Sequence, residues 1–118
     1  MLLKSLRIAV LTKGEKGLED EVAEVFGKAK IITIVDVVDG EIKRVQTSPN
    51  PGASCRFGSG PITTKTLAEM EVDVIVAGEI GPGASAVIED YGIARVTVKP
   101  GIPVSEAIKA AQHRSDRS

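Results

Sequence analysis

The chain has 118 residues, with 15 basic and 16 acidic side chains and a net charge of -1. This length fits one domain whose core needs no structural metal, and a single cysteine excludes an intramolecular disulfide. The charges are dispersed and only 3% of residues are aromatic, which argues against nucleic-acid binding. With neither a membrane-length apolar run nor a signal-peptide pattern, we expect a cytoplasmic protein without a membrane partner.

The beginning of the chain predicts a strand followed by a helix. Residues 7–11 form a short, almost wholly apolar run, typical of a central strand covered on both faces. Apolar residues then recur at helical spacing over 18–26, with acidic residues in the first turn and Gly27 as a stop signal. This pattern predicts a short amphipathic helix.

A hairpin is predicted next. Residues 31–38 are rich in β-branched side chains and lead into Asp39-Gly40, a strong two-residue turn signal. The segment 41–47 alternates apolar and polar residues, which predicts an edge strand exposed on one side.

After a loop rich in glycine and proline over 48–61, helices and strands alternate. The expected elements are a helix from Pro61 to Met70, a strand over 72–77, a glycine-rich turn over 78–83, a helix over 84–91, a strand over 94–99, a turn over 100–103 and a last helix with Ala107, Ile108 and Ala111 on its inner face. We expect one domain over 1–112 and a flexible tail over 113–118.

This order of elements predicts an α/β layered domain with a mostly parallel sheet and one antiparallel hairpin strand at its edge. Ligands of such sheets bind beyond the carboxyl ends of the parallel strands. The rule nominates the turns 12–14 and 78–83, and the loop 52–60 is positioned to cover them as a lid.

The turn 78–83 has two interpretations of equal weight. Its glycines precede a helix start, where unpaired backbone N–H groups and the helix dipole favour an anion. The same glycines fit a tight strand-to-helix connection with no ligand. The spacing matches neither a P-loop nor a dinucleotide fingerprint, and Gly58-Ser59-Gly60 matches only a fragment of the latter.

Cys55 and Arg56 are the chemically distinctive residues of the long loop. A thiolate at Cys55 is a soft metal ligand, and Arg56 offers a fixed positive charge to an anion. One thiol is an incomplete metal site, however, because no Cys-x-x-Cys or His-x-x-x-His pattern completes it. Cys55 as an inert loop residue is an equally weighted alternative.

Catalytic candidates are sparse. His113 is the only histidine and lies in the polar tail, so a nucleophile with a histidine base is not expected. Asp36, inside an apolar strand, and Glu79, in the glycine turn, are the two carboxylates that lack a simple structural explanation. They are the candidate acid and base of an alternative enzyme function.

A set of motifs in order carries a family resemblance. The segments are VFGKAK (25–30), IVDV (34–37), DGEI (39–42), GSGP (58–61), VDVIVAG (72–78) and IGPGA (80–84). Together they resemble the dinitrogenase iron-molybdenum cofactor-binding family over residues 6–110. The resemblance implies a ribonuclease H-like three-layer fold, with a five-stranded mixed sheet between helices on both faces.

The resemblance also implies a function. Members of this family are small carriers or chaperones that bind iron-molybdenum cofactor, its precursors or related molybdenum sulfide clusters, which are anionic and thiophilic. Many relatives carry histidine before the Phe-Gly pair and in the long loop, where this chain has Val25 and the run Cys55-Arg56-Phe57. Cys55 is therefore the candidate metal ligand. The candidate cofactor-binding residues are Thr12, Lys13, Gly14, Cys55, Arg56, Gly58, Gly60, Gly78, Glu79, Gly81 and Gly83.

The leading hypothesis is a non-enzymatic carrier of a metal-sulfur cofactor, with cofactor donor and acceptor proteins as its partners. One alternative is an enzyme that acts on a small anionic metabolite in the same pocket. Another is a protein-interaction adaptor. The sequence leaves open whether the chain is a monomer or a homodimer, since the strand edge at Lys43-Arg44 could pair with another strand.

Overall fold

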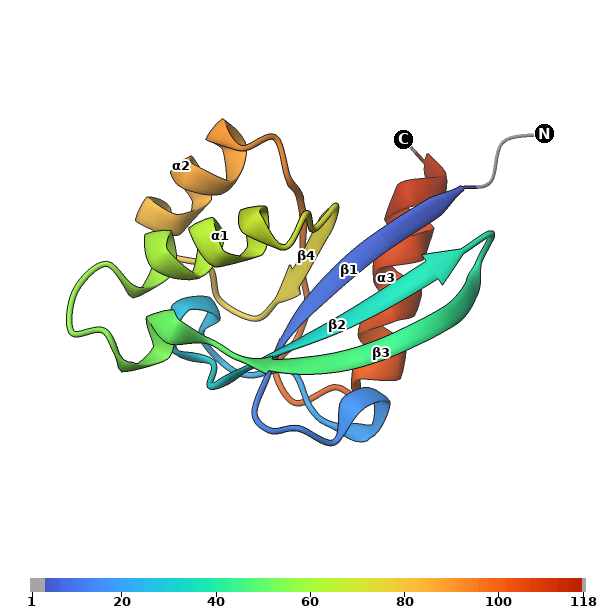
Figure 1. The fold of residues 1–118 in the computed structure, drawn as a ribbon, viewed down its shortest axis with the longest axis horizontal. Coiled ribbons are helices and arrows are strands. Elements are labelled where there is room, and N and C mark those ends of the chain that lie inside the picture. Colours follow the sequence, from blue (N-terminus) through green and yellow to red (C-terminus); the bar gives the residue numbers. More distant parts are fainter. Residues whose placement is uncertain (1–3, 118) are drawn as a thin grey trace.

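The computed structural model describes the backbone of residues 4–117 and the side chains of residues 4–113. Strands and helices alternate through most of this range (Figure 1). The strands are β1 (Ser5–Thr12), β2 (Ile31–Val38), β3 (Glu41–Pro49), β4 (Val74–Ala77) and β5 (Ala94–Thr97). The α-helices are α1 (Ser59–Glu69), α2 (Pro82–Asp90) and α3 (Val104–Arg117), and the 3-10 turns are η1 (Gly17–Glu19), η2 (Phe26–Lys28) and η3 (Pro51–Ser54).

The strands form one mixed sheet in the order β3-β2-β1-β4-β5, which places β1 at the centre as expected. β4 and β5 continue parallel to β1, whereas β2 is antiparallel to both of its neighbours, β1 and β3. The strand with reversed direction is therefore β2 and not the edge strand β3. The physical reason is that residues 13–30 stay at one end of the sheet instead of crossing it, so the chain re-enters beside β1 in the opposite direction.

Helices cover both faces of the sheet, which gives three layers (Figure 1). Side chains of β1 alternate between the two faces, as the period of a strand requires. Ala9 and Leu11 pack with α1 and α2, while Ile8 and Val10 pack with α3. The predicted α/β architecture with a five-stranded mixed sheet and helices on both faces is confirmed.

The helix predicted over 18–26 is wrong. Only the turns η1 and η2 form there, and the chain between them is extended along the end of the sheet. Ala23 N donates to Leu11 O at 2.9 Å, and Val22 N donates to Ile102 O at 3.0 Å. Of the apolar residues that suggested a helix, Val22 and Phe26 are buried, Leu18 is half-buried and Val25 is exposed. Tertiary hydrogen bonds override a weak local helix preference in this segment.

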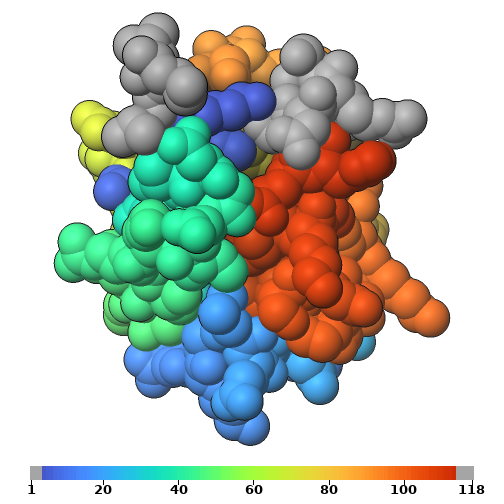
Figure 2. Space-filling view, turned by 90° about the vertical axis from the view of Figure 1, so that its right-hand side faces the viewer, coloured from blue at the N-terminus to red at the C-terminus, as the bar shows by residue number. Residues whose placement is uncertain are grey.

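The hairpin between β2 and β3 is confirmed. Its turn residues Asp39 and Gly40 have φ angles of 50° and 84°, the left-handed pair that a tight hairpin turn requires. β3 is exposed along most of its length, so it is open on both faces and not on one. Figure 2 shows α3 beside this hairpin, and Gln112 Nε2 donates to Gly40 O at 3.1 Å.

The remaining elements differ from the predictions mainly in their boundaries. α1 begins two residues before Pro61, and α3 continues to Arg117. Because the side chains after His113 and all of Ser118 lie outside the described residues, flexibility of 113–118 stays a prediction. No helix within the described range is long and apolar enough to span a membrane.

Candidate functional site

A pocket of about 280 Å³ lies where the N-terminal ends of α1 and α2 meet η2. Three glycine-containing segments that are distant in sequence form its wall. The lining residues are Val25, Phe26, Gly27, Lys28, Gly58, Ser59, Gly60, Pro61, Gly81, Gly83 and Ala84. Four of the predicted binding residues, Gly58, Gly60, Gly81 and Gly83, are thus brought together in one site.

Backbone amides of two helix starts dominate the chemistry of this pocket. The N-cap residues are Gly58 and Gly81, which have no side chain to accept a hydrogen bond from the first turn. The first helical bonds are donated by Ile62 N to Gly58 O and by Ser85 N to Gly81 O, both at 3.0 Å. The first-turn amides without an acceptor in their helix are those of Ser59, Gly60, Gly83 and Ala84, since Pro61 and Pro82 have no N–H. Two positive dipole ends therefore border the same pocket.

Small residues allow the three segments to approach closely. A Cβ atom on Gly60 would lie 2.8 Å from the Cβ of Ala84, so α1 and α2 are in contact at their first turns. A Cβ atom on Gly27 would lie 2.8 Å from Gly60 N and 2.9 Å from Ser59 Oγ. These glycines bring peptide groups to the pocket surface, where larger side chains would hold the segments apart.

Lys28 is the basic residue of the lining. Its Nζ donates to Cys55 O at 2.8 Å, which connects the pocket wall to the long loop. An ammonium group has three donors, so this contact leaves N–H groups for an anion. The pocket thus combines amide donors with one positive charge.

The turn after β1 does not belong to this pocket. The side chain of Thr12 is buried, and its Oγ1 lies 2.9 Å from Thr33 Oγ1. Lys13 Nζ donates to Glu21 Oε1 at 2.8 Å, and this hydrogen bond raises the pKa of Lys13. Gly14 N donates to Asp20 Oδ1 at 3.2 Å. The anion that occupies this predicted site is the chain's own Asp20 carboxylate.

Gly78 and Glu79 have structural contacts. A Cβ atom on Gly78 would lie 2.6 Å from the carbonyl oxygens of both Ala23 and Glu24. Glu79 N donates to Glu24 O at 2.8 Å, and Phe26 N donates to Glu79 O at 2.9 Å. The side chain of Glu79 is exposed. These two residues therefore hold the extended segment and η2 against the sheet.

Cys55 and Arg56 lie beside the pocket but do not line it. Cys55 is half-buried, and its Sγ donates to Pro51 O at 3.5 Å. Arg56 is exposed. Among the described residues, no group of three or more His, Cys, Asp or Glu side chains could hold a metal ion. Ligation by Cys55 stays a prediction.

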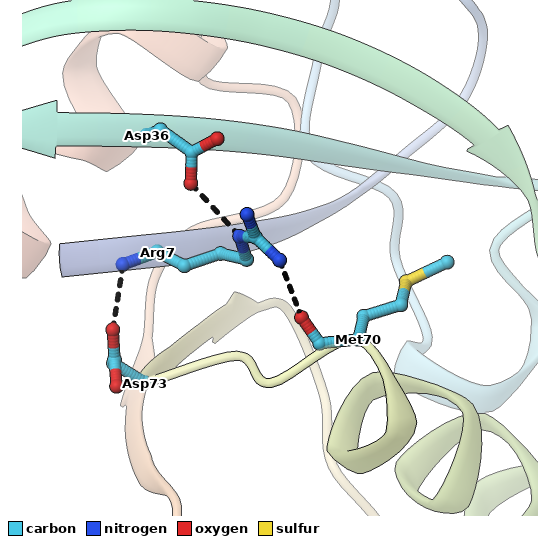
Figure 3. Close-up of polar contacts among 4 residues, drawn as sticks. All are labelled: Arg7, Asp36, Met70 and Asp73. Atoms are coloured by element: carbon cyan, nitrogen blue, oxygen red, sulfur yellow. Dashed lines mark hydrogen bonds and ion pairs between the residues drawn. The ribbon is translucent and has the colours of Figure 1, made fainter.

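Asp36 has a structural explanation between β2 and the central strand β1. Its Oδ1 accepts from Arg7 Nε at 2.8 Å, and Arg7 Nη1 donates to Met70 O at 2.7 Å (Figure 3). The backbone N of Arg7 also donates to Asp73 Oδ2 at 2.7 Å. The hydrogen bond with Asp36 raises the pKa of Arg7. Arg7 thus links β1 to β2 and to the end of α1.

Replacing Arg7 with methionine is expected to lower the free energy of unfolding by about 1–2 kcal/mol, because Asp36 and the Met70 carbonyl lose a charged donor. Urea unfolding at neutral pH measures this change. Lys43→Met is the matched control, since Lys43 pairs with Glu41 at 3.0 Å on the exposed strand and such pairs contribute less than about 1 kcal/mol. Equal losses in the two variants would contradict a linking role for Arg7.

Sequence reasoning missed Gly27, Lys28 and Ser59 as lining residues. The segment 25–30 was part of the family resemblance, but the expected helix concealed its role in a pocket. Asn50 was also missed: its Nδ2 donates to Ala29 O, and its Oδ1 accepts from Gly52 N and Thr63 Oγ1. A polar residue at the end of a strand, followed by proline, was the available signal.

Comparison with known proteins gives the same fold and a family. The chain is 32% identical to an uncharacterized protein of Methanocaldococcus jannaschii over 68 residues, which is 58% of each protein's length. The apo form of the orange protein from Desulfovibrio gigas superposes with a TM-score of 0.79 and 26% identity, covering 92% of this chain and 88% of that one. A putative NifB protein from Thermotoga gives a TM-score of 0.72 and 27% identity with the same coverages. The family described as dinitrogenase iron-molybdenum cofactor matches residues 4–114, and the chain belongs to this family.

Proposed function

We propose that this protein is a non-enzymatic carrier of an anionic metal-sulfide cluster, namely iron-molybdenum cofactor, a precursor or a related cluster. The cluster is cargo, received from a donor protein and delivered to an acceptor. The observation that carries this proposal is the meeting of two glycine-capped helix starts and Lys28 in one pocket. Family membership supports the choice of an iron-molybdenum cluster as cargo.

The pocket chemistry favours binding by hydrogen bonds and charge. None of the lining residues is a cysteine, histidine or carboxylate, so the wall offers donors to terminal sulfide or oxo groups and few ligands to a metal. Helix-start amides stabilise anions without a further counter-ion. Lys28 adds a charge-assisted hydrogen bond. Cargo bound in this way is released without breaking a metal-protein bond.

The same lining supports a role without catalysis. The alternative metabolite enzyme would need Asp36 or Glu79, its candidate acid and base, within reach of a substrate in this pocket. Asp36 is paired with Arg7 outside the lining, and the exposed Glu79 is also absent from it. We therefore favour the carrier over the metabolite enzyme. The ribonuclease H-like fold assignment stays a prediction. A two-metal nuclease of that fold would need an acidic residue at the end of β1, where this chain has Thr12, so we do not propose nuclease activity.

Anaerobic loading with iron-molybdenum cofactor, or with copper(I) and tetrathiomolybdate, followed by gel filtration and metal analysis tests the proposal. We expect the parent protein to retain cargo and Lys28→Met to bind about tenfold more weakly, since one charged hydrogen bond is worth about 1.5 kcal/mol. Cys55→Ser is expected to bind within about twofold of the parent, because backbone donors are unchanged.

Lys65→Met is the matched control, because Lys65 is an exposed lysine of α1 outside the pocket lining. Its binding should equal that of the parent. If the parent retains no more cluster than an unrelated protein of similar size and charge, the carrier function is contradicted. If Cys55→Ser loses the cargo and Lys28→Met retains it, the cluster is bound through ligation by the Cys55 thiol and not through backbone amides.

A further inference from the structure

Phe57 is an exposed aromatic side chain next to the pocket. It is 83% exposed, the highest value among the exposed large apolar residues of the described chain. The other phenylalanine, Phe26, is 1% exposed and lines the pocket. A single exposed apolar side chain is common on protein surfaces, so the exposure of Phe57 matters here only because the residue adjoins the pocket lining. The location of Phe57 therefore links it to the pocket.

The ring is attached one residue before the pocket lining. Phe57 directly precedes Gly58, a lining residue, and consecutive Cα atoms are about 3.8 Å apart. Gly58 has a φ angle of 70°, and a Cβ atom there would meet nothing within 4 Å. The carbonyl of Gly58 accepts the first hydrogen bond of α1, from Ile62 N at 3.0 Å, so Gly58 is anchored to the helix. The ring is repositioned by rotation about the bonds of Phe57 itself, which precede this anchor.

Lys28 connects the cargo site to the same loop. Lys28 lines the pocket, and its Nζ donates a hydrogen bond to the carbonyl of Cys55, two residues before Phe57. An anion in the pocket attracts the ammonium group inward. Because the ammonium has three donors, it can bind the anion and keep the loop carbonyl. The position of the loop is then coupled to the presence of cargo.

We propose that Phe57 is the closing residue of this site: when an anionic cluster occupies the pocket, Lys28 draws the loop inward and the ring of Phe57 covers the cluster. This inference rests on the proposed carrier function. The ring excludes water, which strengthens the amide hydrogen bonds below it. The positively polarised edge of the ring also suits soft, anionic sulfur atoms. Covering the cargo slows its release.

Limited chymotrypsin digestion of the full chain tests the closure, because this protease cleaves after exposed aromatic residues. Phe57 and Tyr91 are the exposed aromatic sites, and Tyr91 is 50% exposed at the end of α2, outside the pocket lining. We expect loading with copper(I) and tetrathiomolybdate to slow cleavage after Phe57 by about fivefold or more, as burial of a loop residue does. Cleavage after Tyr91 in the same sample is expected to be unchanged, and mass spectrometry of the fragments separates the two sites.

Release of cargo to an excess of chelator is the second measurement. Phe57→Ala is expected to release copper-tetrathiomolybdate about fivefold to tenfold faster, whereas Phe57→Leu keeps an apolar cover and stays within about twofold of the parent. Since Phe57 is exposed, neither variant should alter the thermal midpoint of the unloaded protein. Two results would overturn the closure while leaving the carrier function intact. One is an equal rate of cargo release from Phe57→Ala and the parent, and the other is an equal rate of cleavage after Phe57 in loaded and unloaded samples. Failure of the parent itself to retain cargo would overturn both.

Discussion

A Gly78→Ala variant will be destabilised by about 1–3 kcal/mol, because an added methyl group overpacks a closed backbone contact. The Cβ atom would lie 2.6 Å from the carbonyl oxygens of Ala23 and Glu24 and 3.1 Å from Pro100 Cγ. Two of these neighbours are backbone atoms of the extended segment, which cannot rotate away. Displacing that segment also moves η2, so weaker retention of cargo is expected together with the lower stability. Urea unfolding and the gel-filtration assay measure the two effects.

Gly81→Ala is the matched control for Gly78→Ala. Both glycines belong to the turn before α2, but a Cβ atom on Gly81 would meet nothing within 4 Å. Its φ angle of -69° suits any residue. The free energy of unfolding of Gly81→Ala should therefore stay within about 0.5 kcal/mol of the parent. Similar losses in both variants would show that glycine matters in this turn for a reason other than the close approach at Gly78.

An Asp20→Ala variant will lose about 2–4 kcal/mol of unfolding free energy, because three partly buried backbone donors lose their charged acceptor. Asp20 is 6% exposed, and its carboxylate accepts from Gly14 N at 3.2 Å, Lys16 N at 3.0 Å and Glu21 N at 2.8 Å. This carboxylate organises the turn between β1 and the extended segment. Asp20→Asn keeps one acceptor oxygen and should lose less.

The contribution of Asp20 depends on pH. Burial would raise the pKa of this carboxyl group, but the three backbone N–H groups outweigh burial and hold the pKa below its ordinary value of 3.8. A depressed carboxyl pKa stabilises the fold fully above the ordinary value, and this stability is lost as pH falls through the folded value. The difference in unfolding free energy between parent and Asp20→Asn should be constant from about pH 7 to about pH 5 and should shrink below about pH 4.

Glu21→Gln is the control for this pH series. Glu21 forms an ion pair with Lys13 at 2.8 Å, but both side chains are about half exposed. Its contribution is expected to be less than about 1 kcal/mol. If the difference in unfolding free energy between the parent and Asp20→Asn instead stays constant on acidification, that result would contradict a contribution from the charge of Asp20. It would leave only a contribution from the shape of its side chain.

Much of the fold follows from local sequence signals. Buried apolar runs predicted β1, β2 and β4, and Asp39-Gly40 predicted the hairpin. The pattern over 18–26 misled because it fits two structures. Val22 and Phe26, which would share one face of a helix, are also buried by an extended segment at the end of the sheet, whereas Val25 is exposed. Choosing between them requires the hydrogen-bond partners on β1 and near Ile102, which no local pattern contains.

The site was predictable only in part, for a related reason. Gly81 and Gly83 were selected as anion-binding residues before a helix start, and Gly58 and Gly60 as cofactor-binding residues of the covering loop; all four line one pocket. The turn containing Lys13 and Gly14 was selected by the same rule, but its donors are occupied by Asp20 and Glu21. The occupant of a turn depends on tertiary structure. An internal carboxylate and an external anion produce the same glycine signal in the sequence.

The glycine-rich wall of the pocket has a consequence for how such a site is recognised across relatives. Peptide N–H groups are common to all residues except proline, so a site built from them is encoded by the path of the backbone and not by the chemistry of side chains. Searches for shared functional side chains would overlook it. The positions that identify such a site are those where two backbone segments approach closely, such as Gly27 and Gly60. A divergent sequence can keep the same binding chemistry as long as the residues at those positions remain small.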